Sequence, residues 1–437
     1  MYAKRREQLR QILSEANTKY DAVLIDSPEN LYYFTGFTGG EAVFVMYNDI
    51  VVDEIANGKT VSDFNNLSNA NIISSANIVS NISNKNTGDM VSSINSEECM
   101  YIITDSRYYE QVEKECPDIP LIRLEGRTYI ETIKEIFSGQ LAAASFSDKS
   151  DHLMLHAKDE IHQRIKSMWN NGLAIAIEDS MNLSRYLKLK DALTSCELTV
   201  ASELIDKPRT VKDENELELL ARAEQIGDEA FTHILDIIKP GMTEKEIALE
   251  LEFFMKKQGA SKLSFDTIVA SGPNSSMPHA QVTDRVIENG DFVTMDFGCV
   301  YKGYCSDMTR TIAVGTPTDE MKKVYQIVLE ANLRAMEGIR AGVKCSDIDA
   351  LARGYIAEQG YGDYFGHGLG HSVGLYIHEE PRFSPKCDVI IKENMVITDE
   401  PGIYIPGRFG VRIEDLVVVK KDGYERLSNS PKELVII

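Results

Sequence analysis

Two aspartates, Asp296 and Asp307, lie eleven residues apart in a segment that could bring their carboxylates together. Residues 291–298 alternate apolar and polar side chains, which predicts a half-buried strand, and a second β-prone run follows directly after Asp307. If the hairpin closes about Tyr301 and Lys302, the two carboxylates face each other on one side. Like charges in that position are destabilising. Either a cation lies between them, or one aspartate is a turn residue and the other faces solvent.

The histidines point to the same half of the chain. Of the eight histidines, those beyond residue 270 all stand near glycine, proline or a short strand, where a rigid backbone can aim a side chain: His279, His367, His371 and His378. Glu400 and Glu414 occur in similar surroundings. Singly, each would be interpreted as a surface carboxylate or a packed histidine. As a group they favour a shared site.

The chemistry of this group is that of a metal centre. Asp296, Asp307, Glu400 and Glu414 with one imidazole would carry four negative charges, which two divalent cations would neutralise. Such an oxygen-rich set suits Mn²⁺ and tolerates Zn²⁺, Co²⁺ or Fe²⁺. Two ions ~3.5–4 Å apart can lower the pKa of a bridging water and make a nucleophile at neutral pH. The remaining histidines can stabilise charge or move protons.

Several later segments must position these groups. His279 follows a loop that contains glycine and proline. Residues 366–374 hold four glycines in nine positions, which argues against a helix and predicts loop or strand backbone. A strand predicted over 411–419 carries Arg412 and Glu414, which share one face because they are two residues apart.

A length of 437 residues predicts two domains, and a polar turn with proline at 206–209 is the predicted boundary. Residues 1–205 alternate strands and helices, which predicts an α/β domain. Two irregular stretches in it are interpreted as insertions, an asparagine- and serine-rich one near 51–99 and another near 150–171. The strands on either side of the first insertion are expected to form a hairpin. Residues 206–437 form the second domain.

A second histidine group lies in the first domain. His152, His156 and His162 could suggest a metal site, because the first two are four residues apart. No convincing third ligand lies nearby, and apolar residues at helical spacing favour an ordinary amphipathic helix. His233, inside a long predicted helix from 213 to 238, is interpreted as a packing residue.

Composition excludes several classes of function. The net charge is −22 and no cluster of lysine and arginine stands out, so nucleic acid is not an expected partner. The seven cysteines show no CxxC spacing, which favours a reducing compartment over a disulfide framework. No signal peptide and no apolar run of ~18 residues is present. We therefore expect a soluble cytoplasmic protein without membrane contact.

Three segments together resemble a known family. They read Asp-Phe-Gly (296–298) with Gly-Tyr-Cys-Ser-Asp-Met-Thr-Arg-Thr (303–311), then His-Gly-Leu-Gly-His-Ser-Val-Gly-Leu-Tyr-Ile-His-Glu (367–379), then Glu-Pro-Gly-Ile-Tyr (400–404) with Val-Arg-Ile-Glu-Asp (411–415). As a set they resemble the Xaa-Pro peptidases, aminopeptidase P and prolidase, of the pita-bread metallopeptidases. The resemblance implies an α/β N-terminal domain followed by an α+β pita-bread catalytic domain, and a homodimer.

The resemblance also assigns roles. It makes five residues the ligands of a dinuclear centre, with Asp307 and Glu414 as the bridging ones: Asp296, Asp307, His371, Glu400 and Glu414. It implies a catalytic role for His378 and His279, and substrate-side positions for His367, Tyr404 and Arg412. Asp399 departs from the family pattern by adding a charge next to Glu400, which could alter metal affinity.

The activity implied by the resemblance is removal of an N-terminal residue that precedes proline. Proline-containing peptides are the implied partners, and the aminopeptidase on longer peptides is favoured over the dipeptidase. A creatinase-like enzyme without metal, or a non-catalytic binding protein of the same fold, is disfavoured because all five ligand types are present. The large first domain and the particular His-Gly-Leu-Gly-His run argue against a methionine aminopeptidase.

Overall fold

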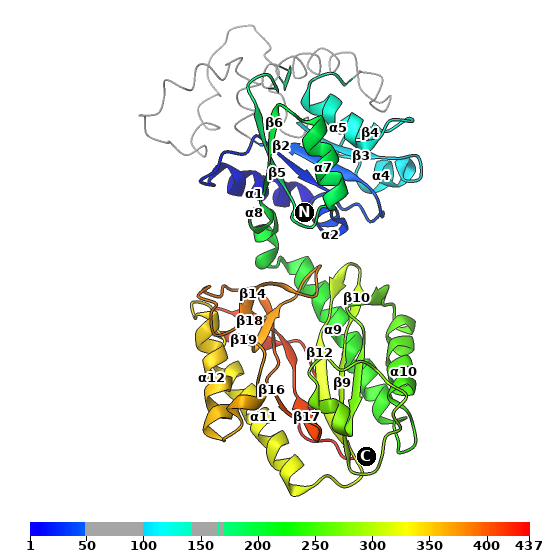
Figure 1. Ribbon diagram of the computed structural model, residues 1–437, viewed down its shortest axis with the longest axis vertical. Coiled ribbons are helices and arrows are strands. Elements are labelled where there is room, and N and C mark those ends of the chain that lie inside the picture. The colour runs from blue at the N-terminus through cyan, green and yellow to red at the C-terminus, as the bar shows by residue number, and fades with distance from the viewer. Residues whose placement is uncertain (49–98, 142–164, 167–168) are drawn as a thin grey trace. The chain divides into compact units, whose positions relative to one another are not determined.

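The computed structural model describes residues 1–48, 99–141, 165–166 and 169–437. The chain divides into two compact units, Met1–Pro208 and Arg209–Ile437 (Figure 1). The predicted turn at 206–209 is helical instead, because helix α8 (Ser202–Asp206) leads into the 3₁₀ helix η5 (Lys207–Thr210). Almost all of the first predicted insertion and most of the second lie outside the described residues. So do His152, His156 and His162.

Within the described residues, the first unit forms a six-stranded mixed sheet with strand order β4-β3-β2-β1-β5-β6. The predicted hairpin is confirmed, because β2 and β3 are antiparallel neighbours. Ser27 caps α2, Pro28 stands in its first turn, and Gly36 at φ 83° ends it. The bounds of the helices and strands of this unit are α1 (Tyr2–Ser14), β1 (Ala22–Ile25), α2 (Pro28–Thr35), β2 (Val43–Tyr47), β3 (Met100–Thr104), α4 (Tyr109–Glu115), β4 (Leu121–Arg123), α5 (Tyr129–Phe137), β5 (Leu173–Ile177), α7 (Leu183–Ala192) and β6 (Cys196–Val200).

The second unit packs two pairs of helices on opposite sides of its strands (Figure 1). Helices α9 (Glu214–Leu235) and α10 (Glu244–Lys257) pack together, and so do α11 (Asp319–Gly338) and α12 (Cys345–Glu358). Thr243 and Glu246, three residues apart, form a capping box at the start of α10. The strands are β7 (Lys262–Leu263), β8 (Ile268–Ser271), β9 (Asp291–Phe297), β10 (Cys299–Tyr301), β11 (Tyr304–Cys305), β12 (Met308–Val314), β13 (Gly370–Ser372), β14 (Glu379–Phe383), β15 (Val396–Asp399), β16 (Gly402–Ile405), β17 (Phe409–Arg412), β18 (Asp415–Lys420) and β19 (Gly423–Arg426).

The predicted hairpin between β9 and β12 exists, but its predicted register is wrong. Lys302 and Gly303 both have positive φ, 47° and 93°, as a two-residue hairpin turn of the primed type requires. The turn therefore closes one residue later than expected, and Asp296 pairs with Thr309 instead of Asp307. A register change of two residues keeps each side chain on its face, because the side-chain period of a strand is two.

The single strand predicted over residues 411–419 is broken. Strand β17 ends at Arg412 and pairs with β16, whereas β18 begins at Asp415 and pairs with β15 and β19. At the break, the Glu414 N–H donates to the Thr309 carbonyl at 3.1 Å. Arg412 and Glu414 consequently do not share the face of one strand.

No helix in the described part of the chain is both long and apolar enough to cross a membrane.

Candidate metal centre

One cavity of about 870 Å³ in the second unit gathers most of the residues predicted for the site. Its walls include His279, Asp296, Asp307, His367, His371, His378, Glu400, Arg412 and Glu414. Tyr404 is buried and contacts two of these residues, His367 and Arg412, through its hydroxyl. Segments far apart in the sequence therefore meet at one place.

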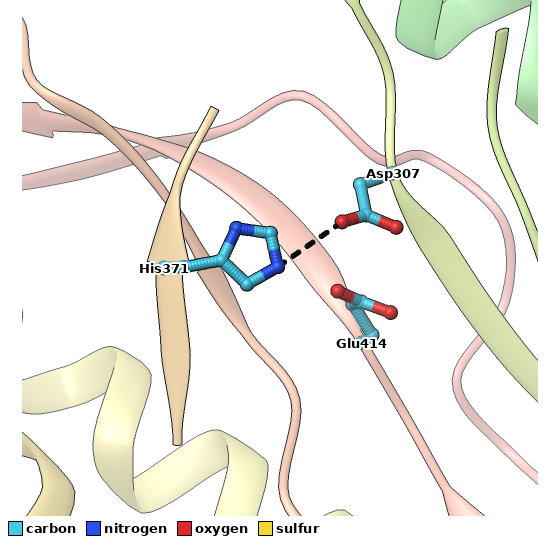
Figure 2. A group of neighbouring side chains, drawn as sticks. All are labelled: Asp307, His371 and Glu414. Atoms are coloured by element: carbon cyan, nitrogen blue, oxygen red, sulfur yellow. Dashed lines mark ion pairs between the residues drawn. The ribbon is translucent and has the colours of Figure 1, made fainter. Parts of the chain in front are cut away.

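The tightest part of the group consists of Asp307, His371 and Glu414 (Figure 2), whose candidate ligand atoms lie within 4.8 Å of one another. Asp307 directly precedes β12, His371 lies on β13, and Glu414 occupies the break between β17 and β18. The His371 Nε2 atom is 3.4 Å from Asp307 Oδ2. All three side chains are buried.

Glu400 and Asp296 flank this trio. Glu400 Oε1 lies 3.7 Å from His371 Nε2. Asp296 Oδ2 accepts a hydrogen bond from Arg412 Nη2 at 2.6 Å, whereas its Oδ1 is buried and has no hydrogen-bond partner among the described residues. An unpaired buried carboxylate oxygen is costly, and a cation beside it would remove that cost.

Hydrogen bonds fix which nitrogen of each ring carries the proton. His371 Nδ1 lies 3.1 Å from the Ser372 carbonyl oxygen, which can only accept, so Nδ1 carries the proton. The lone pair of Nε2 is then free on the side of Asp307, as metal ligation requires. His367 is arranged in the same way: Nδ1 donates to the Gly368 carbonyl at 2.8 Å, and Nε2 accepts from the Tyr404 hydroxyl at 2.9 Å.

The electrostatics of the site favour bound cations. Burial raises the pKa of Glu414 to about 8, and the negative charge of Asp296 adds to the shift. Burial and the nearby Glu414 also raise the pKa values of Asp307 and Glu400. Burial, aided by His378, lowers the pKa of His371 to about 4, so this ring is neutral. Buried carboxylates with one neutral imidazole suit divalent oxygen-binding metal ions.

Arg412 links several parts of the cavity wall. This arginine, 4% exposed, donates to Asp296, to the Tyr404 hydroxyl, to Thr309 Oγ1 and to the Pro278 carbonyl next to His279. Thr309 Oγ1 in turn donates to Glu414 Oε2 at 2.6 Å. Arg412 thus holds carboxylates and histidine segments together, and its predicted contact with substrate stays a prediction.

Two anchors outside the predicted set hold the segments that carry His279 and His367. The Glu244 carboxylate, on α10, accepts hydrogen bonds from Ser271, Asn274 and Thr283 and so closes the loop that contains His279. On α12, Asp349 accepts from the Leu369 N–H and pairs with Arg353, which donates to the His367 carbonyl at 2.7 Å. Sequence analysis missed these anchors. A sequence signal exists only for Asp349 and Arg353, which are four residues apart on α12 and can therefore pair on one helix face.

The pKa shifts predict how the metal-free protein responds to pH. The folded pKa of Glu414 is raised from 4.5 to about 8, so its contribution to stability is full below pH 4.5 and is lost as pH rises through about 8. Buried cysteines with raised pKa values also lose stability as pH rises, but they do so with or without metal, so the difference between the two conditions reports the carboxyls. We expect the unfolding temperature of chelator-treated protein to fall between about pH 7 and pH 9, and Mn²⁺ to suppress the fall because deprotonated ligands bind metal.

Thermal scans with and without Mn²⁺ measure this response. Identical pH profiles in the two series would contradict the proposed link between these carboxyls and metal.

Comparison with known proteins gives matches over both units. Residues 218–421 match the model of metallopeptidase family M24, and residues 5–58 and 69–211 match the creatinase/prolidase N-terminal domain. The Xaa-Pro dipeptidase of Pyrococcus furiosus is 43% identical over 277 residues, 63% of this chain and 78% of the relative. The solved Xaa-Pro dipeptidase from Bacillus anthracis is 36% identical, covers 100% of both chains and has a TM-score of 0.78. The solved X-Pro aminopeptidase from Thermotoga maritima is 33% identical, covers 99% of both chains and has a TM-score of 0.73.

Proposed function

This chain belongs to metallopeptidase family M24 and is a metallo-exopeptidase, and from this premise we propose that it is an Xaa-Pro dipeptidase with a dinuclear metal centre. The predicted fold, an α/β N-terminal domain followed by an α+β pita-bread catalytic domain, is confirmed. The sequence favoured aminopeptidase P over the dipeptidase. The named relatives instead favour the dipeptidase, which was the alternative.

The convergence of the acidic residues and His371 on one cavity supports the metal centre. All five predicted ligands would hold the ions: Asp307, His371 and Glu414 form the trio, and Asp296 and Glu400 flank it. When bound, divalent ions supply Lewis acidity and lower the pKa of water toward neutrality. The oxygen-rich donors fit Mn²⁺, and Zn²⁺ or Co²⁺ are alternatives.

The histidines outside the trio have roles that their surroundings support. His378 is exposed in the cavity, and its ring contacts that of His371 with centroids 4.5 Å apart. Partial burial, together with Arg382, lowers its pKa. Proline nitrogen carries no N–H in the peptide and must gain a proton to leave. We assign this proton transfer to His378, whose ring would take a proton from the attacking water and deliver it to the proline nitrogen. His279 lines the same cavity as a second polar group.

Arg382 supports the preference for dipeptides. It lies on β14 and lines the cavity, and its side chain is 51% exposed. Its partner Glu380 is 71% exposed, and such surface ion pairs contribute only ~0–1 kcal/mol, so Arg382 can exchange Glu380 for a substrate group at little cost. In an Xaa-Pro dipeptide, the free carboxylate is on the proline itself, directly beyond the scissile bond. In a longer peptide an uncharged amide stands there.

Replacing Arg382 by alanine is expected to lower kcat/KM for Gly-Pro by roughly 10- to 100-fold, the effect of losing one charged hydrogen bond of ~1.5–3 kcal/mol. Gly-Pro amide should be affected much less. Lys245→Ala removes another cation that lines the cavity and pairs with an exposed carboxylate, Asp284, and is the matched control. If Arg382→Ala lowers kcat/KM equally for Gly-Pro and for Gly-Pro amide, Arg382 does not bind the substrate carboxylate.

Hydrolysis of Gly-Pro and of Arg-Pro-Pro, each with and without added Mn²⁺, tests the proposed function. We expect metal-dependent cleavage of the dipeptide and little cleavage of the tripeptide. Cleavage of Arg-Pro-Pro alone would make the protein an aminopeptidase P, the second candidate, which the Thermotoga maritima structure favours. Cleavage of neither peptide by metal-loaded protein would indicate a non-catalytic binding role. A homodimer and a cytoplasmic location stay predictions.

A further inference from the structure

We propose that Glu379, held between Arg209 and Lys212, is a positioning residue that shapes the segment from Val373 to His378 and so aims the His378 ring into the cavity. This inference rests on the proposed function, in which His378 acts on the substrate.

The three charged groups form a buried triad within the second unit. Glu379 Oε1 lies 3.0 Å from Arg209 Nη2, and Glu379 Oε2 lies 3.0 Å from Lys212 Nζ. The side chains of Arg209, Lys212 and Glu379 are 4%, 1% and 4% exposed. Burial opposes ionisation of Glu379, but Lys212 and Arg209 outweigh it and lower the pKa of this carboxyl. The carboxylate is therefore ionised and fixed at both oxygens, and removing one partner would leave a buried charge uncompensated.

The triad contacts the turn that precedes His378. Residues 373–378 form neither helix nor strand, so contacts outside regular structure must define their path. Glu379 Oε1 accepts the Tyr376 N–H at 3.3 Å, and the Arg209 guanidinium lies 4.6 Å from the centroid of the Tyr376 ring. The carboxylate packs so close to Gly374 that a Cβ there would lie 2.5 Å from Glu379 Oε2. One buried carboxylate thus contacts this turn at two separate residues.

His378 depends on that turn for its direction. His367 is fixed at both ring nitrogens, by Gly368 and Tyr404. Across the part of the chain that the structure describes, no hydrogen bond from the protein fixes the His378 ring, which makes an edge contact with His371 instead. The position of this ring is therefore set mainly by the backbone of His378. Because Glu379 is the next residue in the chain, a shift of the Glu379 backbone also moves the His378 ring.

A purely structural triad would stabilise the fold without affecting catalysis, and a double-mutant cycle separates the two roles. Glu379→Gln keeps the shape of the side chain and removes its charge. We expect kcat on Gly-Pro to fall by about 10²-fold, the cost of misplacing a catalytic group by about 1 Å, with KM and bound Mn²⁺ per chain unchanged. In a His378→Ala background the same substitution should have almost no further effect.

Glu178→Gln is the matched control. Glu178 is a buried carboxylate of the first unit that accepts hydrogen bonds from Asp26, Ser27 and Asn30. Glu178→Gln should lower the unfolding temperature and leave kcat unchanged, both in the wild-type protein and in the His378→Ala variant. In protein loaded with diamagnetic Zn²⁺, the His378 imidazole resonance, assigned by its absence in His378→Ala, should shift in Glu379→Gln and not in Glu178→Gln.

The outcomes are distinguishable. Equal fold-losses in the two backgrounds, or lower thermal stability with unchanged kcat, would overturn the positioning role and leave the proposed function intact. A wild-type protein that hydrolyses no Xaa-Pro peptide would overturn the proposed function first. A His378→Ala variant with full activity would remove the role assigned to His378, and the positioning role of Glu379 with it, and would leave the proposed activity intact. If Glu379→Gln does not fold, Lys212→Met is carried through the same cycle, because Arg209 still holds one carboxylate oxygen.

Discussion

Replacing Glu414 by glutamine is expected to lower kcat/KM by about 10³-fold or more, because metal activation contributes several kcal/mol and each ~1.4 kcal/mol is a factor of ten. Glu414 is one of the three residues whose candidate ligand atoms lie within 4.8 Å. The amide oxygen of glutamine can still accept the hydrogen bond from Thr309, so the fold should be retained. Metal content by mass spectrometry and hydrolysis of Gly-Pro give the readout, and Asp307→Asn should behave in the same way.

Stability should change in the opposite direction to activity. Glu414 adds to the raised pKa values of Asp307 and Glu400, so removing its charge relieves repulsion in the metal-free protein. The unfolding temperature of metal-free Glu414→Gln at pH 8 should therefore lie above that of the metal-free wild type. Asp228→Asn is the control: its carboxylate accepts hydrogen bonds from Asn429 and Ser430 and does not line the cavity. Full activity of Glu414→Gln, or full metal content, would contradict the assigned role.

Replacing His378 by alanine is expected to lower kcat by roughly 10²- to 10⁴-fold, the usual contribution of a positioned proton-transfer group. Bound metal should stay unchanged, because His378 lies outside the trio. The unfolding temperature should change little, because the side chain is exposed. Steady-state kinetics on Gly-Pro at saturating Mn²⁺ measure the effect.

His233→Ala is the control for loss of a histidine. This ring stacks on Phe254 with centroids 4.3 Å apart and contacts Glu250, which agrees with the packing role predicted for it. We expect this variant to lose some stability and to keep its kcat. A His378→Ala variant with wild-type kcat would transfer the proton-moving role to another group, with His279 as the first candidate.

The local features of the site could be predicted from the sequence. Alternating side chains predicted the hairpin that carries Asp296, and the capping box at Thr243 was visible from residue types three positions apart. The glycine-rich run correctly excluded a helix around His371, which lies on a short strand. Each of these features depends on residues within a few positions of one another, so the sequence pattern contains the physical cause.

Other features were decided only by the tertiary structure. The hairpin register depends on Lys302 and Gly303 both taking positive φ, and residue types allowed a turn one position earlier. Strand β17 ends at Arg412 because the next residues cross to β12, where the Glu414 N–H bonds the Thr309 carbonyl.

The buried triad of Glu379, Arg209 and Lys212 is the clearest feature that only the tertiary structure decided. Glu379 pairs with residues 170 and 167 positions earlier in the chain, Arg209 and Lys212. No periodicity or local spacing relates such residues, because they meet only after the strands and helices between them have packed. Residue types and short-range patterns therefore determined which groups could bind metal and move protons. Packing over long separations decided where those groups point and which buried charges hold them there.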